Sequence, residues 1–314
     1  MADLHIFFIF ATLSAILWVM ALGIAFRAGL RRLGFQAGTP FGELSRVGKG
    51  FRSIVFMLCG VYIIALVWSY VEPYYPKLET VTLTSPKITT PLRIVHISDT
   101  HCEQVRRAED RVIELVQRAQ PDLILFTGDG VSADAGIPQF KRLMTRLSRI
   151  APLYGVRGNW EVWWFSHPDT FAGTGMVELN RKAKTINLHN QSISLVGAPV
   201  DGEAGMKARA RRLPEKSFRI GLHHFPAAIS ILDGTVDLLL SGDTHGGQVS
   251  LPVLGPLIKI RRWNKPYYSA GLHTTPSGTH LYVNRGIGME GRHTPRVRLN
   301  VPPEVTLIKL QPGN

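Results

Sequence analysis

VDLLLSGDTHGG, residues 236–247, joins a short apolar run to a polar, glycine-rich end. A continuous apolar run of this length is typical of a strand that is buried on both faces of a sheet. Asp243 and His245 follow the run directly, and their side chains are of types that bind metal ions. The stretch therefore predicts a buried strand with chemically active side chains just beyond its carboxyl end.

Other apolar runs have the same form, because each is rich in apolar and β-branched residues and ends in small or polar ones. They are LRIVHIS (92–98), DLILFTG (122–128), PLYGVRG (152–158), ISLVGAP (193–199) and FRIGLHH (218–224). Between them, residues 103–120 and 138–150 repeat apolar side chains at helical spacing, and the segment from about 280 to 310 is expected to add strands. Strands that alternate with helices predict an α/β domain with layered sheets and helices.

Metal-ligand side chains follow several of these runs. They are Asp99, His101, Asp129, Asn159, His223 and His224. In open α/β sheets, ligands bind outside the carboxyl ends of the strands, so these loops are expected to converge. Carboxylates, an amide oxygen and imidazoles together suit a pair of divalent ions. A single Gly-Asp or Gly-Asn is an ordinary turn signal; the ordered set is what makes the prediction specific.

Two uncharged runs precede the α/β part: residues 6–26, a run of 21, and residues 54–71, a run of 18. A helix of 21 residues spans roughly 30 Å, the thickness of a bilayer's hydrocarbon core. Two transmembrane helices are expected; the alternatives are a cleaved signal peptide and a buried core helix. The expected organisation is a membrane anchor (1–71), a Pro-rich connector (72–91) and a soluble α/β domain (92–314).

The chain has 36 Lys and Arg against 23 Asp and Glu in 314 residues, a net charge of +13 that favours anionic partners. Basic residues are concentrated between the two uncharged runs, and positive loops stay cytoplasmic, so the α/β domain is expected outside the cytoplasm. No nucleic-acid motif accompanies the charge, and no nucleic-acid partner is expected. With only Cys59 and Cys102, a disulfide framework and a Cys-rich zinc site are excluded.

The motifs ISDTH, TGDGV, GNWE, HHFP and SGDTHGGQ occur in this order along the chain. They resemble the pattern of the calcineurin-like metallophosphoesterases, which is DxH, GDxx, GNHD or GNHE, a histidine, and GHxH. The resemblance covers about residues 90 to 312, and the ending LYVNRGIGMEGRHTPRVRLNVPPEVTLIKL looks like the membrane-anchored bacterial branch, which includes UDP-2,3-diacylglucosamine pyrophosphatases. It implies a four-layer α/β/β/α sandwich and a place in the bacterial inner (cytoplasmic) membrane.

The resemblance also implies a role for each matching residue. Asp99, His101 and His245 would hold a first metal ion, Asp129 would bridge both ions, and Asn159, His224 and Asp243 would hold the second. Asp243 stands where the family has a histidine, and this added carboxylate favours a harder ion. Mn²⁺ is therefore expected, with Zn²⁺, Fe²⁺ or Mg²⁺ as alternatives. Catalysis is assigned to Asp129, Asn159 and His223.

Trp160 stands where many family members have a histidine that contacts phosphate and assists the leaving group. An indole cannot protonate a leaving group at physiological pH. One alternative is that His223 or His293 replaces that donor. A phosphate-type leaving group departs as an anion and needs no proton. The sequence therefore predicts a phosphodiesterase or pyrophosphatase that uses a metal-activated hydroxide.

Large apolar and basic side chains follow two of the site strands, in residues 163–165 and 251–268. Trp160, Arg261 and Arg262 are expected to bind the substrate, a phosphate-containing small molecule or lipid, of the lipid-linked or nucleotide-sugar type; ordinary packing of long loops is the alternative. A different class of function also stays open: a non-catalytic protein that binds metal or phosphate head groups, with a site altered at Trp160 and Asp243. The sequence makes no prediction of oligomeric state.

Overall fold

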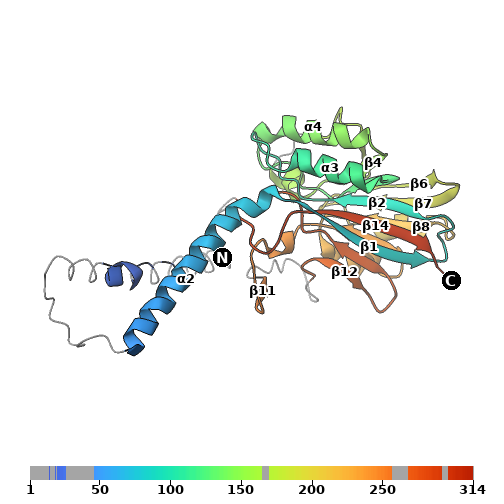
Figure 1. Ribbon diagram of the computed structural model, residues 1–314. Coiled ribbons are helices and arrows are strands. Elements are labelled where there is room, and N and C mark those ends of the chain that lie inside the picture. The colour runs from blue at the N-terminus through green and yellow to red at the C-terminus, as the bar shows by residue number, and fades with distance from the viewer. Residues whose placement is uncertain are drawn as a thin grey trace. The chain divides into compact units, whose positions relative to one another are not determined.

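The computed structural model describes residues 14, 18, 20–25, 46–164, 170–256, 268–291 and 296–313 (Figure 1). The chain divides into two compact units, and the larger unit begins at Val71. All of the predicted strand-end motifs belong to this larger unit.

The helices of the larger unit are α3 (Glu109–Ala119), α4 (Ile137–Ser148), α5 (Met206–Arg211) and α6 (Ile229–Leu232). Short helical turns are η1 (Glu72–Tyr74), η2 (Asp134–Gly136), η3 (Trp160–Trp164), η4 (Pro226–Ala228) and η5 (His245–Gly247). The strands are β1 (Lys77–Ser85), β2 (Leu92–Ile97), β3 (Leu123–Phe126), β4 (Leu153–Gly155), β5 (Val177–Glu178), β6 (Lys182–Leu188), β7 (Gln191–Gly197), β8 (Phe218–Leu222), β9 (Leu238–Ser241), β10 (Ser250–Leu251), β11 (Gly255–Pro256), β12 (Gly271–Thr274), β13 (His280–Val283) and β14 (Glu304–Pro312).

The strands form two six-stranded sheets and a small hairpin of β10 and β11. The first sheet has the order β1-β14-β2-β3-β4-β5, and β2, β3, β4 and β5 run parallel. The second sheet has the order β12-β13-β9-β8-β7-β6, with β13, β9, β8 and β7 parallel. Within each sheet the carboxyl ends of the parallel strands therefore lie along one edge.

Three buried apolar layers hold the larger unit together. One lies between the first sheet and α3 with α4, one lies between the two sheets, and one lies between the second sheet and α5 with α6. Neighbouring residues of a strand point to opposite faces, so Ile94 packs between the sheets while Val95 packs under the helices. Figure 1 shows α3 and α4 covering the sheet that contains β2 and β14. The arrangement is the expected four-layer α/β/β/α sandwich.

The segment 72–91 is not a connector, and this part of the predicted organisation is wrong. β1 lies inside it and pairs in parallel with β14 from Lys77 opposite Glu304 to Ser85 opposite Pro312. Leu83 and Ile88 are buried between the sheets. The prolines that suggested a connector flank the strand, so they leave its ladder hydrogen bonds intact.

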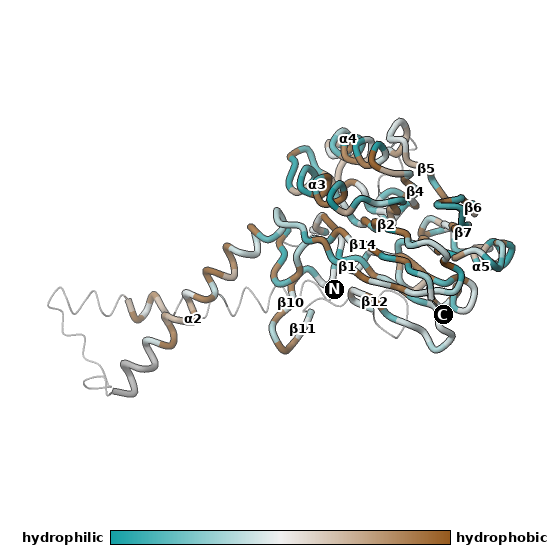
Figure 2. Tube along the Cα trace, turned by 45° about the vertical axis from the view of Figure 1, so that its right-hand side comes forward, coloured by the Kyte–Doolittle hydropathy of each residue, from teal (hydrophilic) through white to brown (hydrophobic). Residues whose placement is uncertain are grey.

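The smaller unit contains the helix α2 (Arg46–Val71). By length and composition, residues Ser53–Tyr74 are the one stretch in the described part of the chain that is long and apolar enough to cross a membrane. The hydrophobic colouring runs along most of α2 (Figure 2). The first predicted span, residues 6–26, lies largely outside the described residues, so two transmembrane helices are not confirmed.

Candidate metal centre

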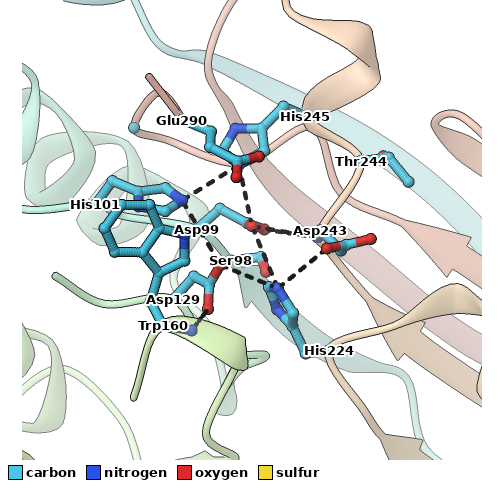
Figure 3. A network of polar contacts seen from close by, with 12 residues as sticks. Ser98, Asp99, His101, Asp129, Trp160, His224, Asp243, Thr244, His245 and Glu290 are labelled. Carbon is cyan, nitrogen blue, oxygen red and sulfur yellow. Dashed lines mark hydrogen bonds and ion pairs between the residues drawn. The ribbon is translucent and has the colours of Figure 1, made fainter. Parts of the chain in front are cut away.

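Five loops from both sheets carry the predicted ligands, and Figure 3 shows the side chains of Asp99, His101, Asp129, His224, Asp243 and His245 gathered together. Asp99 and His101 follow β2, Asp129 follows β3, Asn159 follows β4, His224 follows β8, and Asp243 and His245 follow β9. All seven are buried. The centre thus lies where the carboxyl ends of the parallel strands of the two sheets meet, as the sequence predicted.

Five of these residues have a left-handed backbone, which is uncommon for residues other than glycine. Their φ angles are 50° at Asp99, 39° at His101, 57° at Asp129, 67° at Asp243 and 49° at His245. Such conformations cost free energy and gather at functional sites, where surrounding structure holds them. The strands therefore end in sharply turned loops that aim these side chains inward.

A first group of donor atoms contains two imidazoles and one carboxylate. The Nε2 atoms of His101 and His245 are 3.2 Å apart, and His245 Nε2 is 3.3 Å from Asp99 Oδ1. Burial lowers the pKa of His101 to about 4 and that of His245 well below its usual value. Both rings are thus neutral at neutral pH, the state in which imidazole binds a metal.

A second group surrounds His224 Nε2. It lies 3.1 Å from Asp129 Oδ2, 3.8 Å from Asp99 Oδ1 and 3.7 Å from Asp243 Oδ1. Burial alone would lower the pKa of His224, but the carboxylates of Asp129 and Asp99 raise it well above its usual value. The carboxylates around His224 therefore favour positive charge at this point of the cluster, which is what a bound cation would supply.

The donor set fits divalent ions. Asp99, His101 and His245 form one group of closely spaced ligand atoms, and Asp99, Asp129 and His224 form another. Asn159 Oδ1 is buried and has no hydrogen-bond partner among the described residues. Leaving such an oxygen unpaired costs about 1–3 kcal/mol, which a cation would offset. The Asn159 oxygen is therefore a candidate ligand, and its assignment to the second ion stays a prediction.

Trp160 and His223 were also predicted for the site, and they belong to neither of the two ligand groups. The buried Trp160 ring packs edge-on against the His101 ring, with centroids 5.2 Å apart, and its backbone N–H donates to Asp129 Oδ1 at 2.9 Å. His223 Nε2 lies 3.4 Å from Glu203 Oε1. Burial lowers the pKa of His223 to about 4, so its ring is neutral at neutral pH. Its catalytic role stays a prediction.

Three residues that the sequence reasoning singled out have no described position. Arg261 and Arg262, the expected substrate-binding arginines, fall within residues 257–267, and His293 falls within residues 292–295; both segments lie outside the described residues.

Glu161 was not predicted as part of the site. Its buried carboxylate accepts backbone N–H bonds from Asp129 at 2.9 Å, Gly130 at 2.5 Å and Gly158 at 2.8 Å. Burial, reinforced by Asp129, raises the pKa of Glu161 to about 7. The only sequence signal was the last letter of GNWE, whose partners are revealed by the fold.

Gly158 permits the close approach of two loops at this point. A Cβ placed on it would lie 2.1 Å from Asp129 Oδ1 and 2.6 Å from the Asp129 backbone nitrogen. No side chain larger than hydrogen fits there without moving Asp129. The glycine of the GNWE motif is therefore required by the packing of Asp129.

Comparison with known proteins agrees with this geometry. A family model described as calcineurin-like phosphoesterase matches residues 92–247, which contain all seven predicted ligands. The metallophosphoesterase YkuE of Bacillus subtilis (strain 168) is 31% identical over 264 residues, which are 78% of this chain and 89% of YkuE. The phosphodiesterase YaeI of Escherichia coli (strain K12) is 30% identical over 241 residues, 70% of this chain and 82% of YaeI.

A metallophosphoesterase of Aquifex aeolicus (strain VF5) is 28% identical over 271 residues, covering 78% of this chain and 95% of that protein. These matches extend over most of each relative and agree with the motif order, the sandwich and the clustered ligands. The chain therefore belongs to the calcineurin-like phosphoesterases, a family of enzymes that use divalent metal ions.

Proposed function

We propose that this phosphoesterase hydrolyses a phosphodiester or diphosphate with two divalent metal ions. The observation that carries the proposal is the position of Asp129 Oδ2, which lies 3.7 Å from His101 Nε2 and 3.1 Å from His224 Nε2. One carboxylate oxygen thus faces an imidazole of each ligand group. This is the placement that a residue bridging two ions requires.

The predicted ligands would be shared between the two metal ions. Asp99, His101 and His245 would hold one ion, Asn159, His224 and Asp243 would hold the other, and Asp129 would contact both. Bound ions would supply the positive charge that activates water and offsets the charge developing on the phosphoryl oxygens. The Glu161 carboxylate holds the Asp129 backbone in place by accepting a hydrogen bond from the Asp129 N–H.

Trp160 limits the kind of leaving group that this site can serve. Its indole packs on His101 at the place where the family pattern has histidine, and an indole donates no proton at physiological pH. Substrates whose leaving group departs as a stable anion therefore suit this centre best. Diphosphates and activated diesters meet that condition, whereas simple alkyl phosphates do not.

Mn²⁺ is the ion that we propose for this site. The proposed ligand set for the two ions contains three carboxylates (Asp99, Asp129 and Asp243), the Asn159 oxygen and three imidazoles. Oxygen-rich sets that retain some imidazole suit Mn²⁺ better than sets dominated by nitrogen. Zn²⁺, Fe²⁺ and Mg²⁺ are the alternatives for direct comparison.

A membrane location and a lipid-linked or nucleotide-sugar-type substrate form the finer part of the proposal. Along α2, large apolar side chains are exposed on successive turns: Met57 is 60% exposed, Val61 58%, Ile64 70% and Val67 58%. A helix that presents apolar residues to its surroundings in this way suits lipid. We propose two spans in the bacterial inner membrane with the catalytic domain outside the cytoplasm.

The test compares substrates on the full chain in detergent. We expect metal-dependent hydrolysis of bis(p-nitrophenyl) phosphate and of a lipid-linked diphosphate, with much slower hydrolysis of an alkyl monoester. Asp129→Ala should abolish all turnover, while Glu114→Gln, a change at an exposed ion pair on α3, should leave it unchanged. Two bound ions without turnover of any diester would instead support the non-catalytic binding alternative.

A further inference from the structure

Arg298 is fully buried, and among the described residues its guanidinium has no carboxylate partner within ion-pair distance. Burial lowers its pKa only to about 10, so the side chain keeps its charge at neutral pH. Burying a charge without a counter-charge is costly unless hydrogen bonds compensate for it. The contacts of this side chain therefore indicate what the charge is used for.

The guanidinium donates almost entirely to backbone carbonyls of one turn, residues 285–288. Nη2 donates to Gly288 O at 2.6 Å, Arg285 O at 2.8 Å and Gly286 O at 3.1 Å, and Nε donates to Gly288 O at 3.1 Å. Nη1 donates to Val301 O at 3.0 Å. The planar fork thus gathers the carbonyls of the turn around one point.

This turn packs directly on the loop that carries the first two metal ligands. The Ile287 N–H donates to Ser98 O at 3.1 Å, and the Gly288 N–H donates to Asp99 O at 2.6 Å. A Cβ on Gly288 would lie 2.5 Å from His101 Cβ. The position of the turn therefore fixes the position of the Asp99–His101 loop.

Arg298 also supports the third ligand of the first group, through Gly288. The His245 ring hydrogen-bonds to the Gly288 carbonyl, which Arg298 Nη2 also holds at 2.6 Å. Nη2 itself lies 3.4 Å from His245 Nδ1, but both nitrogens are donors when His245 Nε2 binds a metal, so this contact is one of packing. The second group is held differently, since His224 Nδ1 lies 2.7 Å from the Thr127 carbonyl. One buried side chain thus contacts or supports Asp99, His101 and His245 together.

We propose that Arg298 is a positioning residue that presets the first metal site, all three of whose ligands it supports, and bears on the second site only through Asp99. The inference rests on the proposed two-ion function. The turn requires the planar guanidinium group of Arg298 and not only its positive charge, because a lysine ammonium group cannot donate to all of these carbonyls at once. Arg298→Lys should therefore fail although it preserves the charge.

The test is Mn²⁺ binding to metal-stripped full chain in detergent, measured by calorimetric titration and by electron paramagnetic resonance. Wild type should bind two ions and give the signal of a coupled pair. Arg298→Lys and Arg298→Gln should bind the first-site ion about 10–100-fold more weakly and, at one equivalent, show isolated Mn²⁺. Arg219→Lys is the matched control, because Arg219 also donates to backbone carbonyls, those of Leu213 and Pro214, at the far end of β8.

The outcomes separate the two proposals. If wild type binds two ions and Arg298→Lys binds both as tightly, the positioning role is wrong and the two-ion function stands. If wild type binds fewer than two ions, the two-ion function fails and this inference falls with it. If Arg298→Lys does not fold, Gly288→Ala displaces the same turn from His101 while keeping Arg298, and it must show the same selective loss of the first ion.

Discussion

Trp160 and Asp243 depart from the family motif, and the structure gives each a definite environment. Trp160 packs against His101, and the Asp243 side chain places Oδ1 3.7 Å from His224 Nε2. Each replacement is therefore integrated into the ligand groups. Such integration favours an altered substrate preference over loss of the site.

Trp160→His restores the histidine that the family pattern has at this position. General acid catalysis contributes about 10²–10⁴-fold for poor leaving groups and little for good ones. We expect the rate on a diester that releases phenol to rise by at least about tenfold relative to bis(p-nitrophenyl) phosphate. Trp160→Phe, which changes the packing on His101 without supplying a proton, is the control. Equal changes on both substrates would contradict the assigned role.

Glu161→Gln keeps the shape of the side chain but turns one accepting oxygen into a donor that faces backbone N–H groups. The three N–H bonds at Asp129, Gly130 and Gly158 cannot all survive this change. We expect the metal-free chain to lose about 1–3 kcal/mol of unfolding free energy and turnover to fall more than about tenfold. Chemical denaturation and steady-state kinetics measure these effects. Loss of stability with unchanged turnover would show that Glu161 only supports the fold.

The ligands were predictable from sequence because each one directly follows its own strand, and strand ends converge in α/β sheets. Glu161 and Arg298 were not predictable as site residues. Arg298 lies more than fifty residues along the chain from His245. Its link to the site appears only in the fold, where it hydrogen-bonds to the turn at 285–288. Arg298 acts through backbone carbonyls and lies outside every motif quoted above, whereas Glu161 is the last letter of GNWE, a motif that does not reveal which N–H groups it binds.

At the scale of elements, the strands and the two longer helices were predicted with modest errors at their ends. α3 begins at Glu109 instead of residue 103, since the Glu109 carboxylate accepts the Arg107 backbone N–H at 2.7 Å just ahead of the helix. β1 was missed, although KLETVTLTS alternates apolar and polar residues over part of its length. The flanking prolines outweighed that alternation, and the partner strand β14 lies over two hundred residues away.

Two fragments test the place of β1. A chain of residues 71–314 contains β1, whereas a chain of residues 92–314 lacks it and leaves the β14 edge open. We expect the longer fragment to be monodisperse and to unfold cooperatively. The shorter one should aggregate, because it loses the buried Leu83 and Ile88 and exposes an unpaired edge. Equal melting temperatures and elution volumes would contradict the assignment of β1 to the catalytic domain.

At the scale of the whole molecule, the centre depends on both sheets. Asp99, Asp129 and Asn159 come from the first sheet, and His224, Asp243 and His245 come from the second. The ligands therefore meet only when the two sheets pack over the shared apolar layer. This explains why single motifs are weak signals and their order along the chain is a strong one: the order specifies which strands must end side by side.

The central claim is that this buried cluster is a two-ion centre that cleaves phosphoesters. The most direct measurement titrates metal-stripped full chain with Mn²⁺ while following the hydrolysis of bis(p-nitrophenyl) phosphate. The account predicts negligible turnover without metal and a rise to a plateau at two equivalents of bound Mn²⁺. Turnover that survives metal removal, or a plateau at one equivalent, would contradict it.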